Sequence, residues 1–343
     1  MKSPKRRFVV SLSRSNSDLE QIFWTHHQKH PLAVPSKAEL AELAGVRFSK
    51  GKTIIDCRNP RSSQTLRIFE IMSHGINHPL TVARLNAERI GIVKQLAALG
   101  YRVAVPNYPE VQSEKLISRI RNHAKVFRAR IPGRATSKFT DEKMEIDSSI
   151  FWTRDLWKKI GGKRFKRYLP EHEDPVGEEG KSVTLPNKVI LAHDSIRDSP
   201  SIKALRAQGY HFYFMGDGEV YSPRLSKFLK TLVFEMNDHL DLQIGCVGKV
   251  LLVNQTFFFQ NKAVIEKAAR NAGCEIVFVP KEDENLHAAN FLVLEPGKAL
   301  VDRDAKKTIA LLRQKRITVI PTAISLHVTR ESGANVRCMV NEL

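Results

Sequence analysis

Residues 265–280 read IEKAARNAGCEIVFVP, and this stretch decides the fold. Its first eight residues have the apolar spacing of an amphipathic helix, and its last residues are rich in the β-branched and aromatic types that favour a strand. Gly273 stands between the two, where the end of a helix needs a residue with a left-handed backbone. A helix that turns through one residue into a strand is typical of sheets whose strands are joined by helices. The stretch therefore indicates an α/β fold.

The same order of helix, turn and strand recurs along the chain. Residues 93–106 (VKQLAALGYRVAVP) and 202–214 (IKALRAQGYHFYF) have glycine at the turn, whereas residues 308–321 have Lys315 and Arg316 there. Successive turn glycines are separated by 209 − 100 = 109 and 273 − 209 = 64 residues. If the longer interval holds two units of about 55 residues, the chain contains about five units. An ordinary α/β fold without true repetition would produce the same joints, so the spacing leaves both architectures open.

Short apolar runs between the helices predict buried strands, because each is bounded by Gly, Pro or Asn. These runs are Val189–Ala192, Val250–Val253 and Phe291–Leu294. Residues 7–12 and 53–56 are further candidates for strands. Residues 133–148 are polar and predict a surface loop.

The length of 343 residues fits two domains or one large α/β domain, at roughly 150 residues per domain. No run approaches the roughly 18 apolar residues that a membrane-spanning helix needs. Four cysteines at wide, unpatterned spacing exclude a disulfide framework and a zinc site, and they favour a reducing cytoplasm. The basic start precedes too short an apolar patch for a secretory signal, while residues 1–16 have the acid-free composition of a transit peptide.

The chain is strongly basic, with 55 Lys and Arg against 36 Asp and Glu and a net charge of +19. Such an excess attracts phosphates, and residues 158–167 (KKIGGKRFKR) form a dense basic patch. A solvated surface loop explains the same patch, and no helix-turn-helix, zinc-finger or RNA-recognition signature accompanies it. Nucleic-acid binding is therefore not expected as the main function, and it stays an alternative of another class.

Four short segments carry polar residues beside apolar runs. Asp155 is flanked by aromatic residues, and Glu179 belongs to an acid-Gly turn that leads into a strand. His239 and Asp241 alternate, so that on a strand they would share one face. Cys338 follows a loop of small residues near the C-terminal end. Each segment alone also fits a surface acid, a tight turn or a surface histidine, so the argument depends on the ordered set.

The residue types suit nucleophilic chemistry. A carboxylate beside an imidazole orients the ring and raises its basicity, and a thiol near a histidine can be held as the nucleophilic thiolate. The other cysteines, Cys57, Cys246 and Cys274, lie in or beside apolar runs and are predicted to be structural. Cys338 is therefore the candidate nucleophile.

Taken in order, these segments resemble the guanidino-group-modifying enzymes, the pentein superfamily of arginine deiminase, dimethylarginine dimethylaminohydrolase and the amidinotransferases. The likeness lies in Phe-x-Arg-Asp, here with one extra aromatic residue, in Glu-Gly before a strand, in His-Leu-Asp, and in a Gly-containing loop ending in Arg-Cys-Met. Residues 195–199 and 290–297 resemble two further family segments, and the likeness covers about residues 70–343. It implies a pentein-type α/β propeller of about five pseudo-repeated ββαβ units. Residues 66–343 would form a single catalytic domain, after a basic N-terminal extension or first strands in residues 1–65.

What the resemblance implies is a hydrolase that needs no cofactor and no metal. Cys338 would attack the guanidinium carbon, while His239 would protonate the leaving nitrogen and then activate water. Glu179 matches the acid that supports the histidine. Asp155 and Asp241 match the pair of acids that grip the guanidinium nitrogens, which suits a planar cation with five N–H donors.

The substrate is less well defined than the chemistry. Arg197 matches a residue that binds the substrate carboxylate in arginine deiminases, so the lead reaction converts arginine to citrulline and ammonia. The alternatives are a dimethylarginine hydrolase, an amidinotransferase, an enzyme acting on arginine within polypeptides, and a nucleic-acid-binding protein on a retired enzyme scaffold. Lys181 departs from the family pattern, and only 24 residues separate Asp155 from Glu179. The oligomeric state stays open.

Overall fold

The computed structural model describes residues 6–12, 46–49, 52–55, 79–107, 114–128, 157–161, 163–166, 179–216, 239–331 and 334–343. The strands are β1 (Arg7–Val9), β2 (Val46–Ser49), β3 (Lys52–Ile55), β4 (Arg102–Asn107), β5 (Lys125–Arg128), β6 (Trp157–Ile160), β7 (Lys163–Lys166), β8 (Ser182–Thr184), β9 (Val189–His193), β10 (His211–Met215), β11 (Ile244–Val247), β12 (Val250–Val253), β13 (Glu275–Phe278), β14 (Leu292–Glu295), β15 (Lys298–Val301), β16 (Thr318–Pro321) and β17 (Asn341–Glu342). The α-helices are α4 (Pro79–Ala98), α5 (Glu114–Ser118), α6 (Pro200–Ala207), α8 (Gln255–Gln260), α9 (Lys262–Ala272), α10 (Lys306–Gln314) and α11 (His327–Glu331). Short 3-10 helices are η3 (Glu179–Lys181), η4 (Asp194–Ile196), η5 (Leu240–Leu242), η6 (Lys281–Leu286) and η7 (Val336–Met339).

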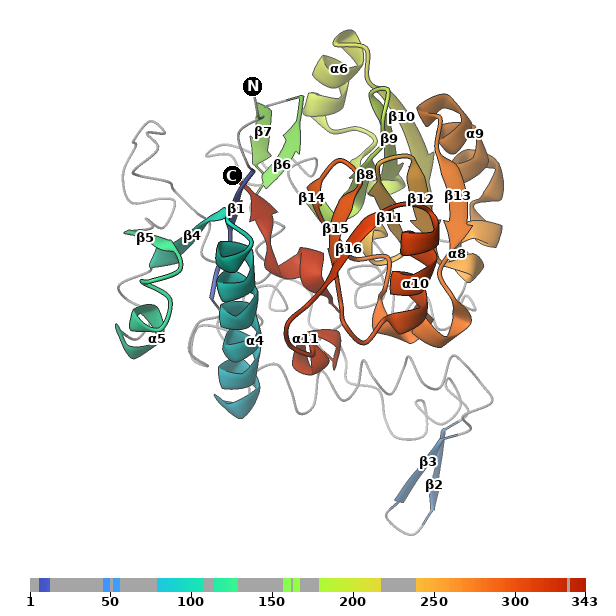
Figure 1. Ribbon diagram of the computed structural model, residues 1–343. Coiled ribbons are helices and arrows are strands. Elements are labelled where there is room, and N and C mark those ends of the chain that lie inside the picture. Colours follow the sequence, from blue (N-terminus) through green and yellow to red (C-terminus); the bar gives the residue numbers. More distant parts are fainter. Residues whose placement is uncertain are drawn as a thin grey trace.

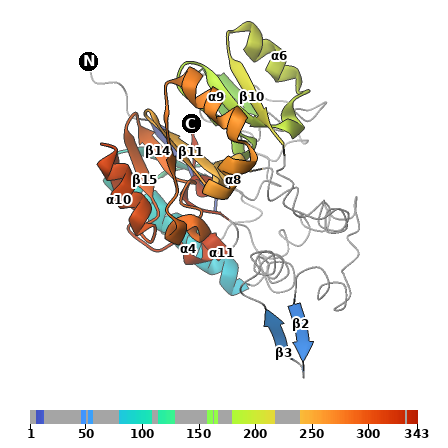
Figure 2. The same ribbon diagram turned by 90° about the vertical axis from the view of Figure 1, so that its right-hand side faces the viewer.

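Three of the sheets are built on one plan (Figure 1). In the sheets β8–β10, β11–β13 and β14–β16, the first two strands pair antiparallel and the third pairs in parallel with the second. A parallel partner can be reached only through a crossover, and a helix provides it in each case. Helix α9 packs against β13 of its own sheet and against β9 and β10 of the preceding sheet. Figure 2 shows α9 beside β10. The repeated helix, turn and strand of the sequence is thus a repeated ββαβ unit.

A fourth sheet follows the same plan with strands from both ends of the chain. Strand β17 pairs antiparallel with β1, and β4 pairs in parallel with β1 after helix α4. Strand β5 adds to the edge of β4. The ββαβ plan is therefore present four times within the described residues, and the α/β prediction is confirmed. The C-terminal strand lies beside the N-terminal one, so the first and last segments of the chain depend on each other.

The turns between helix and strand have the predicted left-handed backbone. Gly273 has φ 66° and caps α9, where its N–H bonds to the carbonyls of Ala269 and Arg270. Arg316, at the turn without glycine, takes the same conformation with φ 62°. A non-glycine residue pays about 1 kcal/mol or more for this backbone. The packing of α10 and β16 around that turn must therefore outweigh the local strain.

The predicted strands are largely confirmed. Val189–Ala192 lies in β9, Val250–Val253 is β12, and β14 begins one residue after Phe291. Strand β1 covers the first part of residues 7–12, and β3 ends one residue before Asp56. Residues 133–148 lie outside the described residues. Within the described part of the chain, no helix combines the length and the apolarity needed to cross a membrane.

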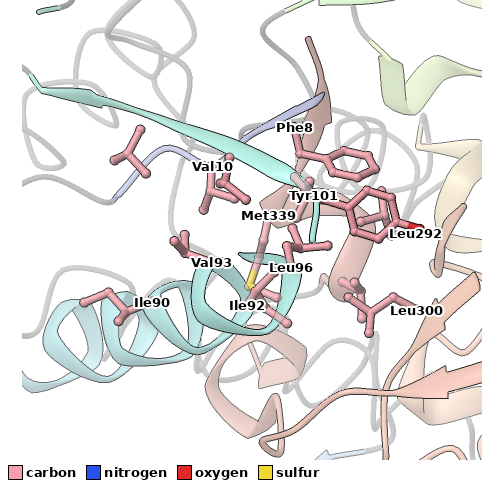
Figure 3. Close-up of a cluster of buried hydrophobic side chains, with 14 of the residues drawn as sticks. Phe8, Val10, Ile90, Ile92, Val93, Leu96, Tyr101, Leu292, Leu300 and Met339 are labelled. Atoms are coloured by element: carbon pink, nitrogen blue, oxygen red, sulfur yellow. The ribbon is translucent and has the colours of Figure 1, made fainter. Parts of the chain in front are cut away.

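Helix α4 anchors the core of the fourth sheet, and this core reaches the C-terminal segment. Figure 3 shows α4 beside β1 and β4, with Met339 directed toward the helix. The rings of Phe8 and Tyr101 meet edge to face, with 5.4 Å between their centroids. The fully buried members of this cluster include Phe8, Ile92, Val93, Leu96, Leu300 and Met339. Each such side chain contributes roughly 1.5–3 kcal/mol on burial, so η7 is held firmly against α4.

Candidate active site

Three of the predicted site residues occupy the same place in three units. Glu179, Asp241 and Cys338 each belong to a short 3-10 helix, namely η3, η5 and η7. Each lies three residues before a first strand of its unit, because 182 − 179, 244 − 241 and 341 − 338 all equal three. Units that share one plan present equivalent positions to equivalent edges of their sheets. Helices η3 and η5 also pack directly against each other.

Asn290 links Asp241 to Cys338 through buried hydrogen bonds. Its amide nitrogen donates to Asp241 Oδ2 at 2.9 Å and to the Asp241 carbonyl oxygen at 3.1 Å. Its amide oxygen accepts from the Cys338 backbone N–H at 3.3 Å, and Cys338 Sγ lies 3.4 Å from the same oxygen. A carboxylate only accepts and an N–H only donates, so the two neighbours fix which way the amide points. Side chains 97 residues apart (338 − 241) thus meet in one buried cluster.

Replacing Asn290 by Ala should destabilise the protein by about 2–3 kcal/mol. The substitution removes two donors from Asp241, whose exposed fraction is only 2%, and a buried carboxylate left short of donors keeps its full desolvation penalty. The measurement is the free energy of unfolding in urea. Asn271→Ala, which removes an exposed hydrogen bond to the Tyr213 hydroxyl, is the matched control and should cost no more than about 1 kcal/mol. Equal losses in the free energy of unfolding for the two variants would show that Asn290 does not hold Asp241 and Cys338 together.

His239 and Asp241 do not lie on a strand, the condition under which they would share one face. His239 precedes η5, and Asp241 lies inside that helix. The Leu242 N–H bonds back to the His239 carbonyl at 3.2 Å, which closes a tight turn in place of the extended backbone of a strand. The two side chains are therefore not paired on one face of a pleated strand. Their alternation with leucine instead buries Leu240 and Leu242, which pack into separate clusters.

The other predicted residues that concern substrate binding and support of the histidine are described by the structure to different extents. Asp155 lies outside the described residues, and for Glu179 the structure gives only its backbone place at the start of η3. Arg197 ends η4 with a half-exposed side chain. Its Nε donates to Asp194 at 2.6 Å, and its guanidinium stacks 4.5 Å from the centroid of Phe214. Its binding of a substrate carboxylate stays a prediction.

The basic segment after Asp155 is not a solvated loop. It forms the antiparallel hairpin of β6 and β7. Lys158 is buried, and its Nζ donates to the Ser182 carbonyl at 2.9 Å. Lys159 Nζ binds Glu342 at 3.0 Å and the Leu343 carbonyl at 3.1 Å. The hairpin thereby joins β8, which follows Glu179, to β17, which follows Cys338, and two of its charges serve this contact.

The turn that carries Cys338 is held by a polar network. Asn335 caps η7, because its Oδ1 accepts from the Val336 N–H at 2.7 Å. Its amide nitrogen donates to the Leu286 carbonyl at 2.6 Å and lies 3.4 Å from Asp302 Oδ2. Arg330 donates to the same Asp302 oxygen at 2.5 Å. The network fixes the start of η7 against the end of β15 and against η6.

Cys246 and Cys274 lie together in another part of the core, as expected of structural thiols. Both pack at the edge of the cluster between β9, β12 and α9. The hydrogen bond between them, with burial as the second cause, raises the pKa of Cys246, and the same bond lowers the pKa of Cys274. Both are free thiols, as is the buried Cys338. Cys57 lies outside the described residues.

Two buried polar residues, Asn290 in the site and Arg89 in α4, were not identified from the sequence. Asn290 stands two residues before the apolar strand β14, one residue nearer to its strand than the acids and the cysteine stand in the other units. Arg89 lies in the apolar stripe of α4, four residues after Leu85 and three before Ile92, yet it is fully buried. A charge inside a helical apolar stripe is a readable signal, because Arg is rarely buried without a partner. The partner itself cannot be read from the sequence.

The chain was compared with known proteins in sequence and in structure. No protein-family model matches the chain, and no curated protein matches it in sequence. The agmatine deiminase of C. jejuni is similar in structure, with a TM-score of 0.50 and 10% identity over 99% of this chain and 93% of that one. The amidinotransferase SxtG of Microseira wollei, from the saxitoxin biosynthetic pathway, gives a TM-score of 0.47 and 11% identity over 98% and 94%. DDAH from Pseudomonas aeruginosa gives 0.37 and 11% over 99% of both chains. With its ββαβ units and its full-length likeness to the first of these structures, the chain has the pentein fold.

Proposed function

We propose that the protein is a hydrolase of a guanidino compound that works through a covalent adduct on Cys338 and uses no cofactor or metal. Deimination of arginine to citrulline and ammonia is the lead reaction. A dimethylarginine hydrolase and an amidinotransferase are the alternatives within the same chemistry. The observation that carries the proposal is the buried connection from Asp241 through Asn290 to Cys338.

The physical case rests on what a guanidinium needs from its site. A planar cation with five N–H donors is best held by carboxylates, and buried carboxylates need such a cation to offset their desolvation. Asp241 is a buried carboxylate that Asn290 connects to a buried thiol, and Glu179 holds the equivalent place in the adjoining helix η3. The net charge of +19 does not prevent binding, because salt screens distant charges beyond about 10 Å. We assign Asp155 to the same set of acids.

The proposed reaction has two halves. In the first, the Cys338 thiolate attacks the guanidinium carbon, the C–N bond to the leaving nitrogen breaks, and His239 gives that nitrogen its proton. A thiouronium adduct remains on Cys338. In the second, water loses a proton to His239 and attacks the same carbon, and the C–S bond breaks to return the thiolate and release the ureido product. Glu179 supports the histidine through both halves. An amine in place of water would turn hydrolysis into amidino transfer.

The finer features of the architecture belong to the same proposal. We assign residues 66–343 to one catalytic domain in which about five ββαβ units close into a propeller, with residues 1–65 as a basic extension that contributes β1. Arg197 would bind the carboxylate end of the substrate. The cytoplasm stays the proposed compartment.

A panel of guanidino compounds tests the proposal directly. Purified protein is incubated with arginine, dimethylarginine, agmatine and an arginine-containing peptide, each with and without glycine as an acceptor amine. Ureido product, ammonia, dimethylamine and transferred amidino group are measured, with Cys338→Ala as the blank. Ureido product from arginine above the blank is the expected result. Dimethylamine release or amidino transfer would move the assignment to the corresponding alternative. No product above the blank from any compound would refute the proposal.

A further inference from the structure

The hairpin of β6 and β7 carries two neighbouring lysines that bind different sheets. Lys158 Nζ donates to the Ser182 carbonyl oxygen at 2.9 Å, at the start of β8. Lys159 Nζ lies 3.0 Å from Glu342 Oε1 in β17 and donates to the Leu343 carbonyl oxygen at 3.1 Å. Successive side chains of a strand point to opposite faces, which lets one strand reach two neighbours. Strand β6 therefore stands between the sheet of β8 and the sheet of β17, and in Figure 1 the hairpin lies next to the C-terminal end of the chain.

Both lysines bind at strands that form the edges of their sheets. Strand β8 is the last in the order β10-β9-β8, and β17 is the first in the order β17-β1-β4-β5. An edge strand has backbone groups on its outer side that no strand of its own sheet can bind. The ammonium groups of β6 donate to a carbonyl oxygen at each of these two edges. The hairpin thus does with side chains what a neighbouring strand would do with its backbone.

The burial of these contacts makes them matter. The exposed fraction is 2% for Lys158 and 3% for Ser182, and a buried carbonyl group that loses its donor keeps its desolvation penalty. The side chains of Lys159 and Glu342 are each 30% exposed, so salt screens this pair less than a fully exposed one. Arg6 Nη1 lies 3.4 Å from the other carboxylate oxygen of Glu342. Both ends of the link are therefore held more firmly than a surface contact.

The two edge strands follow directly on two of the candidate catalytic turns. Ser182 comes three residues after Glu179 of η3, and Glu342 comes four residues after Cys338 of η7 (182 − 179 and 342 − 338). So short a stretch leaves each turn little freedom to move independently of its strand. The hairpin itself is fixed, because Ile160 of β6 is buried in a cluster with residues of β9 and α6. The distance between η3 and η7 is therefore linked to the hairpin.

We propose that Lys158 and Lys159 are positioning residues that hold η3 and η7 at a fixed spacing, with Cys338 aligned to the acids of the neighbouring units. The kinetic consequence rests on the proposed function. A displacement of about 1 Å in a reacting group can cost about 100-fold in rate, whereas carboxylates still hold the cation. Lys159→Met should therefore lower kcat by at least about tenfold and change KM by less than about twofold. Lys159→Arg keeps the cation and should restore most of kcat.

The link can also be measured without substrate. Cys338 has an exposed fraction of 0%, so iodoacetamide reaches its thiol only when η7 opens. Lys159→Met should raise the alkylation rate of Cys338 by at least about tenfold, while the rates of Cys246 and Cys274 in the same sample stay unchanged. Peptide mass spectrometry follows each thiol separately. Lys158→Met should speed amide hydrogen exchange in residues 179–184 by a similar factor.

Lys163→Met is the matched control, because it removes an exposed charge from the same hairpin. It should change neither the alkylation of Cys338 nor the exchange in residues 179–184. Rates in Lys158→Met and Lys159→Met equal to those of Lys163→Met would overturn the inference. Selective opening of η7 with kcat unchanged would overturn it as well. Selective opening in a protein that turns over no guanidino compound would refute the proposed function and leave the link between the turns in place.

A second variant covers the case in which Lys159→Met loses its structure, which equal acceleration of all the thiols will show. Glu342→Gln removes the charge that Lys159 binds and keeps the backbone pairing of β17 with β1. A selective rise in the alkylation of Cys338 in this variant supports the inference. An unchanged rate would overturn it.

Discussion

Cys338→Ala should lower turnover of the guanidino substrate by at least about 1000-fold while the protein stays folded. The thiol is the atom that forms the covalent adduct, so no other group can replace it in the first half of the reaction. The fold should survive because Ala keeps part of the apolar packing of Cys338 with Leu242 and Ala334, and the backbone hydrogen bond to Asn290 remains. Turnover and the free energy of unfolding are measured on the same preparation.

The other thiols serve as matched controls for this experiment. Cys246→Ala and Cys274→Ala remove the same atoms from the edge of another cluster, at a cost of about 1–3 kcal/mol in stability. Both variants should keep turnover near that of the parent protein. Retained turnover in Cys338→Ala would end the covalent mechanism, and equal losses in all three variants would point to a general loss of structure.

Arg330→Met should destabilise the protein by about 3–5 kcal/mol. Arg330 binds Asp302 at 2.5 Å and Asp304 at 2.8 Å, and the exposed fraction of the Asp302 side chain is only 1%. Removing the guanidinium leaves a buried carboxylate without its cation, which costs far more than an exposed ion pair contributes. The loss should also loosen Asn335 and with it the start of η7. Urea unfolding measures the effect.

An exposed ion pair provides the control for Arg330. Arg121 binds Glu114 at 2.7 Å with both side chains more than half exposed, so Arg121→Met should cost no more than about 1 kcal/mol. A loss below about 1 kcal/mol in Arg330→Met would mean that the network around Asp302 does not hold the turn.

The pH dependence of this network has a defined sign. Burial, the largest single effect, raises the pKa of Asp304, but the hydrogen bonds from Ser325 and Arg330 and the charges of Arg330 and Arg303 together leave it below its usual value of 3.8. A carboxyl group whose pKa is lower in the folded state stabilises the fold above its unfolded pKa. That contribution is lost as the pH falls below 3.8 and through the lowered pKa. The difference in the free energy of unfolding between the parent protein and Arg330→Met should therefore decrease over that pH range.

Local sequence patterns predicted most of the helices and strands. Apolar periodicity and the turn glycines placed helices and strands within a few residues, because a helix and a strand depend mainly on side-chain spacing along a short segment. Arg316 shows the limit, since its left-handed backbone is imposed by its neighbours in α10 and β16. The segment around His239 shows another limit. Its alternation of polar and apolar residues fits a strand and a tight helical turn equally, because three residues are too few to distinguish the two.

The sequence by itself determined the kinds of unit and the candidate residues Glu179, Asp241 and Cys338, because their order and their neighbours are local properties. Only the tertiary structure decided which groups meet. Asn290 joins Asp241 to Cys338, and Lys158 turns inward to Ser182, although nothing near these positions in the sequence announces it. Arg89 of α4 is fully buried and donates to the carbonyl oxygen of Ser11, which follows β1. Such contacts join residues 24 to 78 positions apart (182 − 158 and 89 − 11), and they follow from the packing of whole units, which no local pattern encodes.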